Sequence, residues 1–193
     1  YVPKGAYTGA TGVFKTTNDN IATNTFVTLA HPGLGDFNNL DAIAYDVVAD
    51  NAIVATAVES GPSTSSNTTY SNPASSMGYL WYYQALLAKG YHLGPTVDHD
   101  NHKTTFGKTT RSRTAVIAPG PTLTKAAMMT AMRNMNFYAT QDCDTKVDFS
   151  INTRIMGNIF TDRFAPNIAV SLTDVTTSTA AAVIRVMYGV PGS

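Results

Sequence analysis

The sequence predicts an α/β protein with a parallel sheet, followed by a smaller antiparallel β module. Apolar, β-rich runs alternate with segments of helical spacing between residues 25 and 97, an order typical of parallel α/β sheets and barrels. From about residue 144 the pattern changes to short segments of alternating polarity, which are typical of antiparallel strands. We therefore expect one domain over residues 1–143 and the start of a second, β-sandwich-like domain over residues 144–193.

Three apolar runs and two segments of helical spacing make up the first half of the chain. The predicted strands span residues 25–30, 53–58 and 91–97. The predicted helices span residues 40–48 and 77–89, and the second is expected to bury Leu80, Tyr83, Leu86 and Leu87. Gly90 stands where a C-cap glycine belongs. Ser, Thr, Asn and Pro predominate over residues 60–76 and predict a long loop.

The second half begins with one more strand and one more helix. A strand is expected over residues 113–118, and Thr124 is a suitable N-cap for a helix over residues 125–136. The methionines of that helix have the spacing of a core-facing stripe, so we interpret them as packing residues. Antiparallel strands are predicted over residues 146–151, 168–172 and 182–188.

Composition limits the classes of partner. Lys and Arg together equal Asp and Glu together, at 13 each, so nothing in the net charge attracts nucleic acid or an anionic membrane. No apolar run approaches the ~20 residues that span a bilayer, so we expect no membrane insertion. Charged residues are only 13% of the chain, and the polar surface of Thr, Ser and Asn suggests an extracellular, cell-surface or periplasmic protein. The single cysteine, Cys143, is expected to be buried or inert.

The most informative segment is Gly94–His102, where Asp98, His99, Asp100 and His102 follow a predicted strand. Two of the four histidines of the chain lie in it, and imidazole nitrogen with carboxylate oxygen is a donor set for a divalent metal. His31 and Glu59 end two other predicted strands. Parallel strands present their carboxyl ends at one edge, so we expect these residues to gather there. From the residues alone, a polar turn explains the cluster equally well, and His92 is interpreted as a satisfied core or surface histidine.

Several stretches together resemble a known family, the PHP (polymerase and histidinol phosphatase) superfamily of metal-dependent phosphoesterases, in its secreted carbaryl-hydrolase-like (CehA/McbA-like) branch. They cover much of residues 25–160: 28–32 (TLAHP), 57–61 (AVESG), 90–102 (GYHLGPTVDHDNH), 113–116 (RTAV), 133–140 (RNMNFYAT) and 155–157 (IMG). The resemblance implies a distorted (β/α)7 barrel with two or three manganese, zinc or iron ions. Members begin with a His-x-His pair, but no histidine precedes His31 here. We therefore expect only the C-terminal part of the barrel, its N-terminal half lying elsewhere in the same polypeptide.

Carried over residue by residue, the resemblance implies that His31, Asp100 and His102 bind metal, with Glu59 as a further acidic ligand. Asp98 would orient a ligand imidazole, and His99 would protonate the leaving group. Arg113, or Arg111, would bind a substrate oxyanion.

The activity that the resemblance implies is hydrolysis of a phosphoester by metal-activated water, acting on a small-molecule ester. Carbamate or aryl-ester hydrolysis is an alternative within the same branch. Two further alternatives are a non-catalytic extracellular structural or adhesive protein on a degenerate PHP-like scaffold, and a regulatory module that keeps one metal. The oligomeric state is left open.

Overall fold

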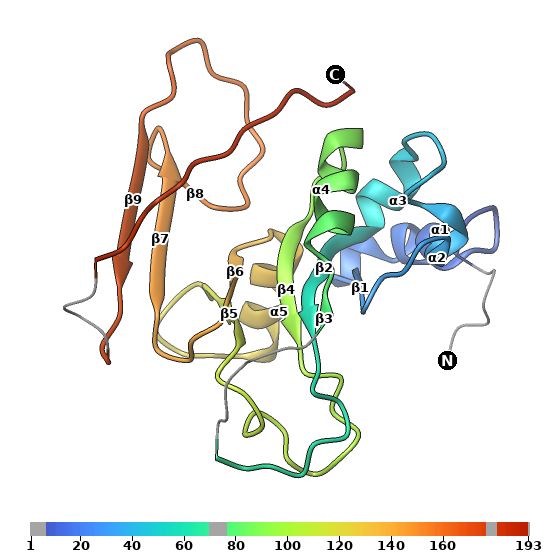
Figure 1. Ribbon diagram of the computed structural model, residues 1–193. Helices are drawn as coiled ribbons and strands as arrows, with labels where there is room; N and C mark the ends of the chain where they lie inside the picture. Colours follow the sequence, from blue (N-terminus) through green and yellow to red (C-terminus); the bar gives the residue numbers. More distant parts are fainter. Residues whose placement is uncertain (1–6, 70–76, 177–180, 193) are drawn as a thin grey trace.

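A computed structural model of the chain describes residues 7–69, 77–176 and 181–192 (Figure 1). Three parallel strands form its central sheet: β1 (Val27–Leu29), β2 (Ile53–Ser60) and β4 (Gly94–Asp98), with β2 between the other two. The short strand β3 (Met77–Gly78) pairs antiparallel with the end of β2. The predicted α/β class is confirmed in this form. The described strands close no barrel: besides the central sheet they form two small antiparallel sheets.

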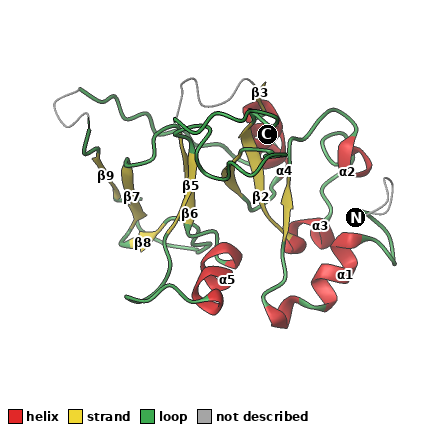
Figure 2. Cartoon of the chain, turned by 90° about the horizontal axis from the view of Figure 1, so that it is seen from below, coloured by secondary structure: helices red, strands yellow, loops and turns green. Residues whose placement is uncertain are grey.

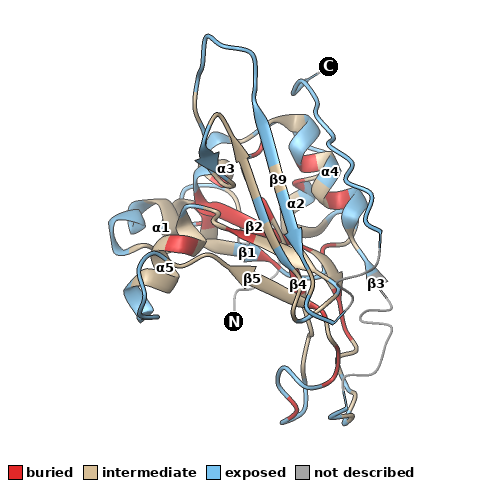
Figure 3. Cartoon of the chain, turned by 90° about the vertical axis from the view of Figure 1, so that its left-hand side faces the viewer, coloured by how far each residue is buried: buried red, intermediate tan, exposed pale blue. Residues whose placement is uncertain are grey.

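Helices cover one face of the central sheet. They are α1 (Val13–Asp19), the 3₁₀ helix η1 (Ile21–Thr23), α2 (Asp36–Asn39), α3 (Val47–Ala52) and α4 (Leu80–Lys89). The larger hydrophobic core lies on this side, where Phe14, Tyr82 and Leu86 from the helices pack with Leu29 and Ile53 from the strands. Figure 3 shows buried residues concentrated along β2 and the inner side of α4. None of the described helices is long and apolar enough to cross a membrane.

A second, smaller core lies around strands β5 (Arg113–Val116) and β6 (Phe137–Thr140) and helix α5 (Lys125–Arg133). β5 and β6 pair antiparallel, and Phe137 packs with Val54 and Ala55 of β2. Met132 and Met135 pack against this core, as expected for two of the four methionines. The helix predicted over residues 125–136 ends at Arg133, so Met135 lies just beyond it. The hydroxyl of Thr124 accepts a hydrogen bond from the backbone N–H of Ala127 (3.0 Å), which confirms it as the N-cap.

The third sheet is built from β7 (Lys146–Ile151), flanked antiparallel by β8 (Arg154–Ile155) and β9 (Ile168–Thr173). Its strands lie to one side of the central sheet, and β9 is largely exposed (Figures 1 and 3). Residues 181–192 run as an irregular, exposed segment, which we call the terminal arm, so the strand predicted over 182–188 is wrong. The arm returns to α4, where the N–H of Gly192 donates to the carbonyl of Ala88 (2.8 Å).

Two predicted helices begin elsewhere. The helix over 40–48 is wrong because the Asp46 carboxylate accepts from the N–H groups of Val48 (2.8 Å) and Ala49 (3.4 Å), so that α3 begins at Val47. The helix predicted from residue 77 begins at Leu80, after β3, and ends at Gly90 with φ 100°, the left-handed cap expected there.

The inward face of α4 also differs from its prediction. Tyr82 and Leu86 are fully buried, one helical turn apart, and Tyr83 packs beside them. Leu80 and Leu87 instead face outward, with 51% and 37% of their surface exposed. Strand β6 was not predicted as a strand, and β8 was not predicted at all.

Candidate functional site

The three parallel strands end at a common edge, as expected. His31 follows β1, Glu59 lies at the end of β2, and Asp98 closes β4, with its backbone opposite Ser60. The loops that leave β2 and β4 run together beyond this edge (Figure 1). The parallel pairing thus brings residues from three separate segments of the sequence to one side of the sheet (seen from below in Figure 2).

Hydrogen bonds join the loops after β2 and β4 into one unit, which we call the edge loops (residues 61–69 and 99–112). The N–H of Gly61 donates to the carbonyl of Asp98 (3.1 Å), and the N–H of His102 donates to that of Ser63 (2.9 Å). The Thr105 hydroxyl donates to the carbonyl of Ser65 (3.2 Å). The backbone of His102 is therefore held by a contact with the loop after β2.

Asp98 is a half-buried carboxylate at this edge. Burial raises the pKa of its carboxyl group, and the charge of Asp100 adds to the rise. Hydrogen bonding to Thr96 and the electrostatic influence of His31 and His99 act in the opposite direction. The role predicted for Asp98, orienting a ligand imidazole, stays a prediction.

The other residues predicted here have defined surroundings. His99 Nε2 lies 2.8 Å from the carbonyl oxygen of Ser112, so this nitrogen carries the proton and donates it to the carbonyl. His102 Nε2 lies 3.3 Å from Asp100 Oδ1, and the His102 side chain is 65% exposed. His31 and Asp100 both have positive backbone φ angles, 32° and 48°.

Glu59 has one paired and one unpaired carboxylate oxygen. The amide of Gln141, which follows β6, donates to Oε1. Oε2 is buried and has no hydrogen-bond partner in the described part of the chain. A buried carboxylate oxygen without a donor is costly, so a cation would be stabilised at this atom.

The predicted ligands do not form a closed cage. Among the described residues, ligand atoms of three or more acidic, histidine or cysteine side chains lie within 4.8 Å of one another only at Asp142, Cys143 and Asp144. His31, Glu59, Asp100 and His102 share the edge but lie further apart than this limit as a group. The predicted residues therefore lie at the same edge of the sheet, but their ligand atoms do not form a compact metal site.

Arg113 is hydrogen-bonded to three backbone carbonyl groups of the edge loops. Its guanidinium donates to the carbonyl oxygens of Gly107 (2.7 Å), Thr110 (2.6 Å) and Ser112 (2.7 Å). These bonds stabilise the loop that carries Asp100 and His102. Binding of a substrate oxyanion by Arg113 stays a prediction.

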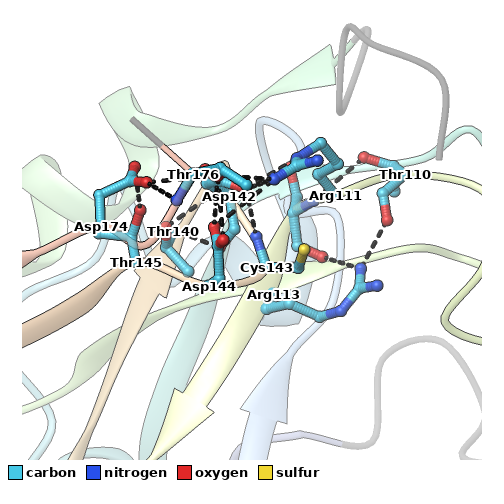
Figure 4. Close-up of polar contacts among 11 residues, drawn as sticks. Thr110, Arg111, Arg113, Thr140, Asp142, Cys143, Asp144, Thr145, Asp174 and Thr176 are labelled. Atoms are coloured by element: carbon cyan, nitrogen blue, oxygen red, sulfur yellow. Dashed lines mark hydrogen bonds and ion pairs between the residues drawn. The ribbon is translucent and has the colours of Figure 1, made fainter. Parts of the chain in front are cut away.

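A polar cluster that was not predicted from the sequence joins the β6–β7 turn to the segments that precede β5 and follow β9 (Figure 4). The Arg111 guanidinium contacts Asp142 (2.6 Å) and Asp144 (3.5 Å), and the Thr176 hydroxyl contacts the Asp144 carboxylate (2.9 Å). The hydrogen bond from Arg111 lowers the pKa of the Asp142 carboxyl group. Cys143 lies between the two aspartates and is exposed, so it is not buried, and its expected inertness stays a prediction. The Asp-Cys-Asp run was visible in the sequence, but its Arg111 partner depends on tertiary packing.

Comparisons of the chain with known protein families, with curated proteins and with solved structures found no match.

Proposed function

We propose that the protein is a metal-dependent hydrolase of phosphoesters, built on part of a PHP-like barrel, with its site at the carboxyl edge of β1, β2 and β4. The observation that carries the proposal is the unpaired, buried Oε2 of Glu59 on the central strand of that edge. A carboxylate oxygen of this kind is stabilised by a cation, and imidazole and carboxylate donors flank it on the neighbouring strands.

The donor set suits manganese, zinc or iron. His31, Asp100 and His102 would hold the metal with Glu59, supplying imidazole nitrogen and carboxylate oxygen. The desolvated Asp98 supports the same view, because a nearby cation would offset the burial of its charge. A bound divalent metal lowers the pKa of a coordinated water toward neutrality, which provides a hydroxide nucleophile at physiological pH.

The residues of the chain have separable tasks in this proposal. Asp98 would orient the imidazole of a neighbouring ligand such as His31. His99 donates through Nε2 to the Ser112 carbonyl, which leaves Nδ1 as the nitrogen that takes up a proton and returns it to the leaving group. Arg113, already fixed by three carbonyl groups, would hold the substrate oxyanion. The substrate is a small phosphomonoester or phosphodiester, with carbamates and aryl esters as the acyl alternative.

A second candidate is an extracellular structural or adhesive protein without catalysis. It is favoured by the exposed apolar side chains of the third sheet and the terminal arm, among them Ile168, Leu172, Val183 and Tyr188. Exposed apolar surface of this kind is typical of interaction faces. The two candidates differ in whether the carboxyl edge binds metal.

The deciding experiment combines elemental analysis of the purified protein with hydrolysis of bis(4-nitrophenyl) phosphate before and after chelation. We expect bound manganese, zinc or iron and turnover that a chelator abolishes and added metal restores. Glu59→Gln should lose metal and turnover, since the amide keeps the contact with Gln141 but not the charge. Asp148→Asn, on the exposed side of β7, is the matched control and should keep both. Absence of metal and turnover in the parent protein would contradict the hydrolase and favour the structural role.

A further inference from the structure

A cavity of about 510 Å³ lies between α4 and the terminal arm, away from the carboxyl edge of the sheet. Its walls are largely apolar: Leu80, Tyr83 and Leu87 come from α4, and Met187, Val190 and Pro191 come from the arm. The volume is within the range of small-molecule sites, roughly 300–1,000 Å³. The arm is fixed at its end by the hydrogen bond from the Gly192 N–H to the Ala88 carbonyl. Pro191 also lies close to the end of α4, since a Cβ placed on Gly90 would be 3.4 Å from the Pro191 side chain.

His92 lines the cavity together with the polar side chains of Tyr83, Gln84, Tyr91 and Tyr188. The His92 ring is held by a hydrogen bond to Asp50. Asp50, whose side chain is only 8% exposed, accepts from His92 Nδ1 (2.9 Å) and from the His92 backbone N–H (2.6 Å). The Tyr45 hydroxyl donates to the same carboxylate (2.7 Å). Three donors thus hold Asp50, and Asp50 in turn fixes the His92 ring.

This arrangement determines what His92 can offer to a ligand. Because Nδ1–H donates to Asp50, the neutral ring presents Nε2 as a hydrogen-bond acceptor. Nε2 has no partner among the residues that the structure describes, and the His92 side chain is 49% exposed. An oriented acceptor at an apolar cavity is complementary to a molecule with an apolar body and one hydroxyl donor.

We propose that this cavity binds a small phenol or aryl alcohol, whose ring packs against α4 and the arm and whose hydroxyl donates to His92 Nε2. Tyr83 and the leucines of α4 supply the apolar contacts, and ring packing against Tyr83 adds to them. The proposal is independent of the metal site, since it uses none of the residues at the carboxyl edge.

The test follows the histidine ring signals in ¹H–¹³C NMR spectra during titration with 4-propylphenol, with propylbenzene as the probe that lacks the hydroxyl. The chain has four histidines, so the His92 signal is assigned as the one missing in His92→Ala. We expect a saturable shift of the His92 signal with the phenol and at least tenfold weaker binding of propylbenzene. His92→Ala, followed through the ring signals of Tyr83, should weaken phenol binding at least tenfold.

Two leucine variants separate the cavity from general surface adhesion. Leu80→Ala removes a wall residue and should weaken binding of 4-propylphenol several-fold. Leu123→Ala removes a leucine that is similarly exposed but does not line the cavity, and it should bind like the parent. An unchanged His92 signal up to the solubility limit of the phenol would overturn the proposal. Equal affinity for phenol and propylbenzene would overturn it as well, because His92 would then contribute nothing.

Discussion

The hydroxyl of Thr114 bonds both backbone groups of Val97: it accepts from the N–H at 2.9 Å and donates to the carbonyl at 3.2 Å. Thr114 lies on β5 and Val97 on β4, and these strands belong to different sheets. Val97 is buried at the outer edge of β4, where its backbone groups would otherwise need a neighbouring strand as hydrogen-bond partner. The Thr114 side chain provides both hydrogen bonds instead.

Thr114→Val should destabilise the protein by about 1–3 kcal/mol, because the isosteric methyl leaves two backbone groups of Val97 without partners. Urea unfolding followed by circular dichroism measures the change. Thr114→Ser retains the hydroxyl and is the matched control, expected to lose less than the valine variant. Equal losses in both variants would mean that packing, and not hydrogen bonding, accounts for the role of Thr114.

Gly94→Ala should destabilise the protein by about 1–3 kcal/mol through overpacking. A Cβ at Gly94 would come within 2.6 Å of the Phe137 ring, which is buried and has little room to move. A double-mutant cycle with Phe137→Leu, measured by urea unfolding, should show a favourable coupling energy, since the smaller side chain makes room for the methyl group. Additive losses would contradict the steric explanation.

Tyr82→Phe should leave stability unchanged or raise it by about 1 kcal/mol. The Tyr82 hydroxyl is buried without a hydrogen-bond partner in the described chain, and burial raises the pKa of the phenol. Thermal unfolding at neutral pH is the measurement. Tyr91→Phe is the contrasting variant, because the Tyr91 oxygen accepts from the Asp46 N–H (3.1 Å), and its loss should lower the melting temperature. A clear loss in Tyr82→Phe would reveal a partner for that hydroxyl.

Arg111→Gln should weaken the dependence of stability on acid pH. Arg111 lowers the pKa of Asp142 in the folded state, so this carboxylate contributes stability above its unfolded pKa of about 4. That contribution is lost as the pH falls through the folded pKa. Urea midpoints compared between pH 6 and pH 2 should therefore fall less steeply in Arg111→Gln than in the parent protein.

The control for the acid-pH comparison is Lys146→Gln, which removes an equal charge from an exposed position of β7. It should retain the slope of the parent. A parental slope in Arg111→Gln would show that other carboxylates, such as Asp162 with its own lowered pKa, dominate the acid unfolding.

The parts of the fold that could be predicted from sequence have strong local patterns. β2 is a continuous run of small and β-branched residues, and Thr124 is a local cap that needs no tertiary partner. β6 escaped prediction because only Phe137 of its four residues is buried, so it has no clear period. The terminal arm failed in the opposite way: its apolar pattern is that of a strand, but no neighbour pairs with it in the described structure.

The candidate site also has a part that the sequence predicts and a part that depends on tertiary packing. Sequence order alone implied that His31, Glu59 and Asp98 share an edge, because consecutive parallel strands end on the same side. The contact of Gln141 with Glu59 spans 82 residues and depends on how β6 packs against the central sheet. No local pattern encodes such a contact, and the same is true of the bond between His99 and the Ser112 carbonyl.

The left-handed backbone at His31 and Asp100 means that selection for stability alone would act against two of the candidate metal ligands. A residue with a side chain costs about 1 kcal/mol or more at such a position, a penalty that glycine avoids. Directed evolution for thermal resistance alone should therefore favour His31→Gly and Asp100→Gly. A heat-selected library would remove candidate ligands from two different strands while the fold improved, so heat tolerance and metal affinity would have to be screened together.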